Sequence, residues 1–352
     1  MILNETPVRT SKNFKINNIE LKDLNISQKL KKFNGLSVYG DISDFIISED
    51  VENIQLTYGL GKELEKQVYE SANKKIKIIT NSINKRRFIN FDFNLDEENM
   101  QLVENIELTA KPKSKTTITI KYMSDDKNEY YHNGILKINA MENSQIDVII
   151  VNMLNSISSN FLSMENTLEE SSNVNYCIVD FGGRTSISNY YSNLIGNNAK
   201  SNLNTIYLGT ESQIFDINYI AELRGERTDA NIEVQGALKD NAKKNFKGTI
   251  DFKKGSKKAK GNENEFCMLL SDTAKSKALP ILLCTEEDVE GNHSSAAGKI
   301  EKDMLFYIMC RGFSYKEAMK LIVKAKFNEI LENIQDEELK EEILNNIDER
   351  LD

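Results

Sequence analysis

Two histidines and four cysteines are the side chains of this 352-residue chain best suited to binding a transition metal or a sulfur species. His293 lies within Gly291–Gly298, whose sequence is GNHSSAAG. Small neighbours leave an imidazole uncovered, and an uncovered imidazole can bind a metal ion. His293 is therefore a candidate metal ligand, and an ordinary polar histidine at the surface is the alternative interpretation.

The four cysteines are spaced too widely for a zinc finger or ribbon, because no CxxC pair occurs. Cys284 ends the apolar run Leu279–Cys284, so it is either a ligand near His293 or a buried strand thiol. Cys267 is a second candidate ligand, which its neighbours neither favour nor exclude. We expect Cys177 to be a buried strand thiol and Cys310 to pack within a helix. Unpaired thiols indicate a reducing cytoplasm.

Charge and composition exclude several classes of protein. With 45 Lys and Arg against 54 Asp and Glu, the net charge of −9 argues against a general nucleic-acid binder. Met1–Thr10 contains Glu5 and Arg9, so the sequence predicts no signal peptide. It also predicts no membrane span, because no run of about 18 apolar residues occurs. A lysine-rich stretch is interpreted as a solvated face. It comprises Lys239, Lys243, Lys244, Lys247, Lys253, Lys254, Lys257, Lys258 and Lys260.

No phosphate-binding GxxxxGK[ST], GxGxxG, GxSxG or HExxH motif occurs, which argues against a nucleotide hydrolase, an α/β-hydrolase and a zinc protease. One enzymatic alternative remains, a parallel β-helix that processes polysaccharides. Such a site needs clustered carboxylates, or an arginine with a calcium site, on one face. Its candidate residues are Asp180, Arg184, Asp216 and Arg224.

The elements that must position these side chains fall into three zones: a mixed α/β region over residues 1–100, a strand-rich core over 101–298 and a helical region over 299–352. In the core, apolar or small anchors recur at intervals of 14 to 17 residues. They are Phe215, Ile232, Phe246, Gly261, Ala278 and Ser294. The lack of amphipathic segments between strands argues against a doubly wound α/β sheet, and the spacing is compatible with a β-solenoid with coils of about 16 residues, a sandwich or an open sheet.

The helical region has recognisable boundaries. Gly312 ends a first helix, and Ser314 with Glu317 predicts a capping box for a second. The second helix should bury one apolar stripe, formed by Ala318, Leu321, Ile322, Ala325 and Ile330. A third helix after Asp336 should bury Leu339, Ile343, Ile347 and Leu351. These helices either cap the last coil of the solenoid or dock another protein.

The segment Phe266–Phe313 resembles the SufB/SufD family of iron–sulfur cluster assembly proteins. The residues that carry the resemblance are Leu269–Ala274, Ala278–Pro280, Asp288–Ile300, Leu305–Tyr307 and Arg311–Phe313. Upstream, Gly182–Thr185 with Asn193, Leu194 and Ala199 looks like earlier coils of the same family. The resemblance covers about residues 134–327, and the first hundred residues match weakly.

The resemblance implies a mainly β fold, a right-handed parallel β-helix with a C-terminal helical region. It implies a scaffold rather than an enzyme, one that pairs with a second SufB/SufD-type chain and docks the ATPase SufC through its C-terminal helices. The candidate contacts with SufC or with the cap are Met304, Phe306, Tyr307 and Phe313. The alternative is a solenoid dimerisation module without metal chemistry.

Cluster assembly in the family uses a cysteine and a histidine near the joint between subunits, and His293 falls on that histidine. The assembly cysteine falls at Phe266 or Cys267, depending on a one-residue shift. Ser294 stands where SufB-type chains carry a glutamate, and Gly291 where many SufD-type chains carry a cysteine. A SufD-like role, or a reduced relative that uses Cys267, is favoured. An iron–sulfur cluster would then be held transiently at the subunit interface, with thiolates from a partner and no tightly bound cofactor.

Overall fold

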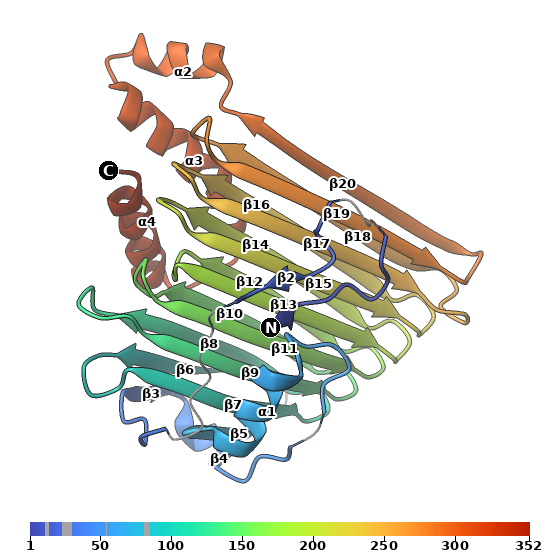
Figure 1. Ribbon diagram of the computed structural model, residues 1–352. Helices are drawn as coiled ribbons and strands as arrows, with labels where there is room; N and C mark the ends of the chain where they lie inside the picture. The colour runs from blue at the N-terminus through green and yellow to red at the C-terminus, as the bar shows by residue number, and fades with distance from the viewer. Residues whose placement is uncertain (11–13, 23–29, 54, 81–84) are drawn as a thin grey trace.

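The computed structural model describes residues 1–10, 14–22, 30–53, 55–80 and 85–352, and two nine-stranded sheets form most of it (Figure 1). Sheet 1 contains, in spatial order, β20 (Val289–Lys299), β18 (Ala259–Leu269), β16 (Asp229–Leu238), β14 (Lys200–Gly209), β12 (Asn173–Asp180), β10 (Gln145–Met153), β8 (Lys115–Ser124), β6 (Arg86–Leu95) and β3 (Leu36–Gly40). Sheet 2 contains β19 (Lys275–Cys284), β17 (Lys243–Phe252), β15 (Ile214–Leu223), β13 (Thr185–Leu194), β11 (Ser159–Leu168), β9 (Tyr131–Ala140), β7 (Gln101–Ala110), β5 (Lys74–Thr80) and β4 (Phe45–Ser48).

The chain alternates between the two sheets, so the predicted β-solenoid is confirmed, but its predicted coil length is wrong. Gln145 pairs with Asn173, Asn173 with Lys200, and Lys200 with Asp229, so one coil takes 27 to 29 residues here. The six predicted anchors fall on six successive strands, β15 to β20. The interval of 14 to 17 residues is therefore one strand with its turn, and each coil contains two such units.

Parallel pairing extends upstream of residue 101, because β5 pairs with β7 and β6 with β8 in parallel register. The division of the chain at residues 101 and 299 stays a prediction. At the N-terminal side, β3 and β4 add to the two sheets in antiparallel orientation.

The turns stack as regularly as the strands. Asn143, Ser171 and Asn198 occupy equivalent turns of successive coils, and each has a positive φ between 56° and 59°. The N–H of each donates to a carbonyl oxygen of the next turn at 2.9 Å. The left-handed conformation aims that N–H along the stack, which satisfies a backbone donor that the turn would otherwise leave unpaired.

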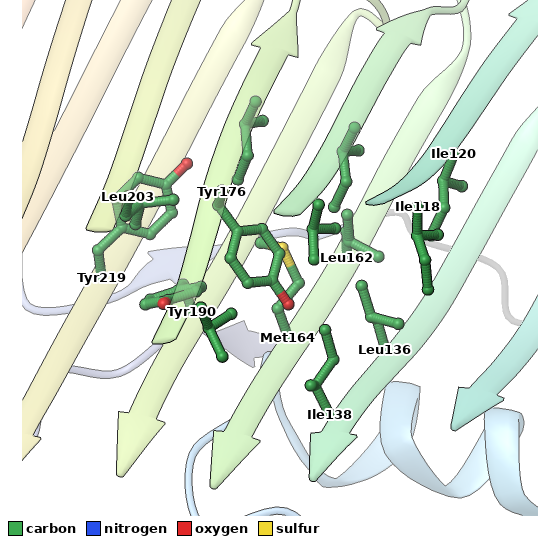
Figure 2. Packing of buried hydrophobic residues seen from close by; sticks show 14 of the residues in the cluster. Ile118, Ile120, Leu136, Ile138, Leu162, Met164, Tyr176, Tyr190, Leu203 and Tyr219 are labelled. Carbon is green, nitrogen blue, oxygen red and sulfur yellow. The ribbon is translucent and has the colours of Figure 1, made fainter. Parts of the chain in front are cut away.

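Inward-facing side chains fill the space between the sheets (Figure 2). Tyr190 packs edge to face against Tyr176 and Tyr219, with ring centroids 5.1 and 6.0 Å apart. Aliphatic side chains from the earlier coils continue the core, among them Ile118, Leu136 and Leu162. Because successive strand residues point to opposite faces, the same positions of every coil contribute to this core.

The N-terminal residues form a strap across the outer face of sheet 2. β1 (Ile2–Leu3) pairs antiparallel with β2 (Ile19–Glu20), and Asn4 follows β1. The Asn4 amide donates to Asp216 at 2.8 Å, and Lys247 donates to the Asn4 carbonyl at 2.9 Å. The 3-10 helix η1 (Ile42–Asp44) precedes β4, and α1 (Lys62–Ser71) packs against β7 and β9.

Three helices follow the solenoid, α2 (Lys302–Met309), α3 (Tyr315–Leu331) and α4 (Glu337–Leu351). The Ser314 capping box is confirmed: Ser314 accepts from the Glu317 N–H, and the Glu317 side chain accepts from the Ser314 N–H. The stripe predicted for α4 is buried as expected. The stripe predicted for α3 is wrong at Leu321 and Ala325, which are both exposed, because Met319, Val323 and Phe327 face the core instead.

Helices α3 and α4 pack on the outer face of sheet 1, where they form a second core with strand residues such as Val151 and Val179 and with Phe181, which follows β12. The rings of Phe181 and Phe327 stack with centroids 6.3 Å apart. The two helices therefore cover the side of the solenoid rather than its last coil, and α2 lies beyond β20 (Figure 1).

The lysine-rich stretch is only partly the solvated face that the sequence predicts. Lys244 and Lys247 are wholly buried and form ion pairs with Glu265 and Asp216. They occupy strand positions that point into the core and beneath the strap, respectively, so the interpretation is wrong for these two lysines. Phe246 and Phe252, in the same stretch, are fully buried in the core.

Candidate functional site at the open end of the solenoid

β19 and β20 form the last coil, and among the described residues no further strand pairs with either of them. The inner side chains of this coil are therefore uncovered on one side, and we call this surface the open end. On β18, Gly261, Glu263, Glu265 and Cys267 are buried, alternating with partly exposed neighbours, which places these four on the inner face.

His293 lies on the inner face of β20, directly next to Glu263 in the register. Ser295, two residues further on the same face, donates to Glu265 of the coil below at 2.8 Å. That bond shows that this part of β20 directs the side chains of His293 and Ser295 to the inner face of the sheet. His293 itself is exposed, so the expectation of an uncovered imidazole is met by the geometry.

Beneath His293 lies a group of buried ionisable side chains. Glu265 accepts from Lys244, and both side chains are fully buried. Glu263 has no hydrogen-bond partner for either carboxylate oxygen. Burial and, second, the negative charge of Glu265 raise the pKa of Glu263 to about 8, and Lys244 opposes that shift.

Cys267 and Cys284 lie in different surroundings. Cys267 is fully buried on β18, and burial is the main cause that raises the pKa of its thiol. Cys284 is exposed at the end of β19, where its Sγ lies 2.9 Å from the Glu286 carbonyl oxygen. Its register partner is Phe252, whereas that of His293 is Glu263, so the two candidates occupy different columns.

Within the described ranges, no group of three or more His, Cys, Asp or Glu side chains is arranged to hold a metal ion. Cys177 is buried on β12, as expected, and burial raises its pKa to about 12. Cys310 does not pack within a helix: it is exposed at the C-terminal cap of α2. The expectation of helix packing is wrong because α2 buries none of its residues.

The four aromatic and methionine candidates for docking are all exposed. Met304, Phe306 and Tyr307 are 48%, 69% and 56% exposed on α2, and Phe313 is 43% exposed in the link to α3. Phe313 and Leu321 also line a small groove of about 200 Å³ with charged residues of α3 and α4. These side chains form one region beside the open end, which we call the α2 surface.

The four residues of the polysaccharide alternative do not come together. Asp180 is buried inside the solenoid, where it accepts from Ser186, whereas Asp216 is buried under the N-terminal strap. Arg184 pairs with Glu129 at the surface, and Arg224 with Glu222. This set provides no shared carboxylate site.

A polar network inside the early coils was not predicted. His132 is fully buried, with Nδ1 2.6 Å from the Asn160 amide oxygen and Nε2 3.3 Å from Glu104. Tyr122 also donates to Glu104. Glu104 pairs with Gly134 in the register, and His132 lies two residues before Gly134 on the same face of β9, so the period of this coil is needed to find the contact.

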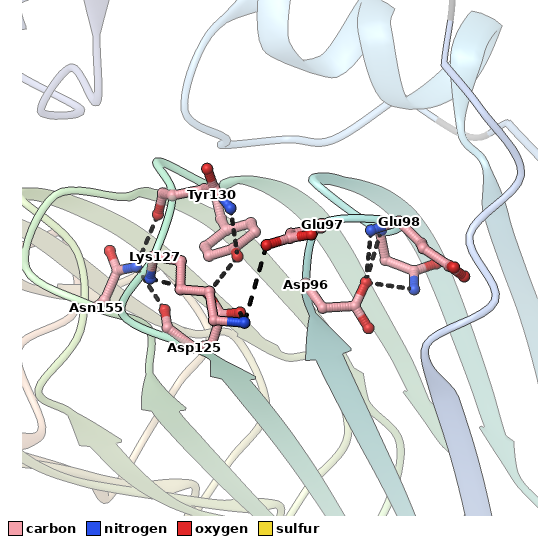
Figure 3. Close-up of polar contacts among 9 residues, drawn as sticks. Asp96, Glu97, Glu98, Asp125, Lys127, Tyr130 and Asn155 are labelled. Atoms are coloured by element: carbon pink, nitrogen blue, oxygen red, sulfur yellow. Dashed lines mark hydrogen bonds and ion pairs between the residues drawn. The ribbon is translucent and has the colours of Figure 1, made fainter.

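A cavity of about 730 Å³ lies at the turns that precede β7, β9 and β13, and it is bounded by Phe33, Tyr131 and Arg184. Figure 3 shows the polar contacts of the neighbouring turns: Tyr130 donates to Asp125, and Asn155 donates to the Asp125 carbonyl at 2.7 Å. The sequence contains no motif that points to this cavity.

No helix among the described residues is both long and apolar enough to cross a membrane. The fold and the open end define a β-solenoid protein with a histidine exposed on its last coil and an uncovered helical surface beside it.

Comparison with known proteins identifies the family. The model of the SufBD core domain of the SUF system for FeS cluster assembly matches residues 93–326. The chain therefore belongs to the SufBD family, and the predicted resemblance is confirmed.

Individual relatives are distant. The iron–sulfur cluster assembly protein SufD of Bacillus subtilis is 22% identical over 252 residues, which covers 71% of this chain and 58% of the relative. SufD of Escherichia coli is 22% identical over 238 residues, covering 68% and 56%. A SufBD family protein of Pyrococcus horikoshii is 31% identical over 154 residues, covering 43% and 33%. The matches thus span less than two thirds of the length of these relatives.

Proposed function

We propose that the chain is a SufD-like scaffold subunit of a complex that assembles iron–sulfur clusters. It pairs through its open end with a second SufB/SufD-type chain, identical or distinct, and it docks a SufC-type ATPase on the α2 surface. The observation that carries the proposal is the last coil, whose inner face exposes His293 and whose strand β20 leads into an apolar helix that buries none of its residues. Catalysis of ATP hydrolysis belongs to the partner.

The donor set suits a shared site. His293 supplies an exposed imidazole, but the nearby thiol of Cys267 is buried and its raised pKa disfavours the thiolate. Iron–sulfur clusters need soft thiolate ligands, so those ligands come from the partner chain in this proposal. The exposed free thiols of Cys284 and Cys310 suit the reducing cytoplasm predicted from the sequence.

Purification with the SufC-type ATPase under reducing conditions tests the docking surface. We expect stable association, and we expect Phe306→Asp to weaken it at least tenfold because Phe306 would be desolvated on docking. Phe14→Asp is the matched control, because the Phe14 side chain is exposed and its carbonyl oxygen accepts from Lys277 of β19, which places it on the strap over sheet 2 and not on α2. Failure of the folded chain to associate with the folded ATPase would refute the docking role.

Reconstitution with iron and sulfide tests the role of His293. His293→Ala should leave the fold intact and lower cluster yield in the assembled complex. Unchanged yield would favour the alternative function, a dimerisation module without metal chemistry, which binds the same partners but is indifferent to this substitution.

A further inference from the structure

We propose that Glu263 is a positioning residue for His293: a carboxyl oxygen of Glu263 accepts from one ring N–H of His293, so that the other, unprotonated nitrogen faces the joint where iron enters. The inference rests on the proposed role of His293 as a ligand. It adds a residue on the neighbouring strand, which no motif in the sequence singles out.

The strand register places Glu263 next to His293. Glu263 and His293 are Cα partners on neighbouring parallel strands, which run about 4.8 Å apart. Residues paired in this way point to the same side of the sheet, and the Ser295 hydroxyl bond to Glu265 demonstrates this two residues further on. The side chain of His293 therefore projects over the side chain of Glu263.

The carboxyl group of Glu263 is buried and has no hydrogen-bond partner. Its side chain is 1% exposed, and both of its carboxylate oxygens lack a hydrogen-bond partner. Glu265, on the same face, has Lys244 and Ser295 as donors. A buried polar group without a partner costs about 1–3 kcal/mol, so a donor that reached Glu263 would be stabilised there.

The opposite sheet leaves space for this carboxyl group. Gly248 of β17 faces it, and a Cβ atom at Gly248 would lie 2.7 Å from the Glu263 Cδ. Any larger residue there would displace the carboxyl group. The interior of the coil thus accommodates Glu263 in the position directly beneath the exposed histidine.

A carboxyl group next to a histidine can orient that histidine as a metal ligand. A histidine that binds a metal usually has its second ring nitrogen bonded to a carboxylate or carbonyl oxygen, which fixes both the tautomer and the orientation of the ring. Glu263 is the described carboxyl group that has free oxygens and occupies the register position next to His293. With one nitrogen bound below, the exposed nitrogen is left as the ligand.

Imidazole nitrogen NMR of the full chain tests the proposal, because the sequence contains only two histidines. His293→Ala assigns the signals, and those of the buried His132 report whether the solenoid is intact. We expect one dominant tautomer for His293 in the wild type. In Glu263→Ala we expect both tautomers, and a Zn²⁺ dissociation constant at His293 about 10- to 100-fold larger.

Two further variants separate positioning from a structural effect. Glu263→Gln keeps a side-chain amide oxygen that can still accept from the ring N–H of His293. This variant should therefore retain Zn²⁺ affinity within a few fold. Asn264→Ala removes the equivalent bond on the outer face, where Asn264 accepts from Ser294 at 2.8 Å, and it should change neither measurement. An identical tautomer distribution and Zn²⁺ affinity in wild type and Glu263→Ala would overturn the proposal.

The same variants distinguish this inference from the proposed function. If His293→Ala lowers cluster yield while Glu263→Ala leaves the imidazole unchanged, the inference fails and the ligand role stands. If His293→Ala leaves cluster yield unchanged, the ligand role fails, whatever the NMR measurement gives.

Discussion

Two buried glutamates on one face of β18 differ in their partners, and the one without a donor, Glu263, has a raised pKa. Glu265 is paired with Lys244, while Glu263 lies beside that pair without a donor. The pKa of Glu263 rises from its usual 4.5 to about 8 through burial and the charge of Glu265. Because the folded state binds this proton more tightly than the unfolded chain, Glu263 lowers stability as pH rises from about 4.5 to 8.

Glu263→Gln should therefore stabilise the protein at alkaline pH. The advantage over wild type should be small near pH 5 and grow to a few kcal/mol near pH 8, since each unit of pKa shift corresponds to about 1.4 kcal/mol. Urea unfolding of both proteins across this range measures it. Glu290→Gln, in an exposed ion pair with Lys260, is the control and should show no such trend. A constant difference between Glu263→Gln and wild type would show that Glu263 is ionised in the fold.

The cysteines give a second prediction at this scale. Iodoacetamide should modify Cys284 and Cys310 in the native protein, because both are exposed, and should spare Cys177 and Cys267 until the chain unfolds. Burial raises the pKa of both protected thiols, which suppresses the reactive thiolate as well as access. Peptide mass spectrometry after timed labelling measures the four rates. Rapid labelling of Cys267 would restore it as a candidate ligand of this chain.

At the scale of the elements, the sequence predicted strands and turns better than the coil they build. The spacing of Phe215, Ile232 and Phe246 marks successive strands correctly, but a spacing alone does not tell whether neighbours in sequence are also neighbours in the sheet. The register settles that point, since Ile217 pairs with Phe246 and Ile232 with Glu263. Glu263 could not be predicted as a site residue from the sequence, because only the register places it next to His293.

The composition of the lysine-rich stretch also did not predict that some of its charges are buried. Lys247 lies in a run of lysines, yet the strap covers it completely and leaves it paired with Asp216. The strap comes from residues more than 200 positions away in the chain, so no local pattern signals it. Burial lowers the pKa of Lys247, and the charge of Asp216 opposes that shift.

Removing one member of this pair should cost more than removing both charges. Lys247→Met leaves Asp216 buried without its cation, so we expect a loss of about 3–5 kcal/mol in unfolding free energy. Adding Asp216→Asn should recover part of that loss, because the amide keeps some bonds to Asn4 and needs no counterion. Lys260→Met, in the exposed pair with Glu290, is the control and should have little effect. Urea unfolding of wild type, the two single variants Lys247→Met and Asp216→Asn, the double variant and the control gives the comparison, and additive losses would contradict the coupling.

At the scale of the whole molecule, the two ends of the solenoid differ. Antiparallel strands β3 and β4 close the sheets at the N-terminal side, whereas β19 and β20 leave the inner face of the last coil uncovered. Leu282 shows the consequence: its register partner Ile250 is 1% exposed, while Leu282 is 39% exposed at the equivalent position. A second chain placed on the open end would complete the burial that every earlier coil has.

Leu282→Lys and Phe306→Lys should separate the two proposed interfaces. A lysine at 282 would have to be desolvated on pairing, so we expect the affinity for the second SufB/SufD-type chain to fall by at least tenfold, about 1.4 kcal/mol, with ATPase binding retained. Phe306→Lys should have the opposite pattern, because Phe306 lies on the α2 surface. Sedimentation of each variant with each partner measures both affinities. Both positions are exposed in the single chain, so neither change should unfold it, and equal losses at both interfaces would mean that one continuous surface, rather than two, holds the complex together.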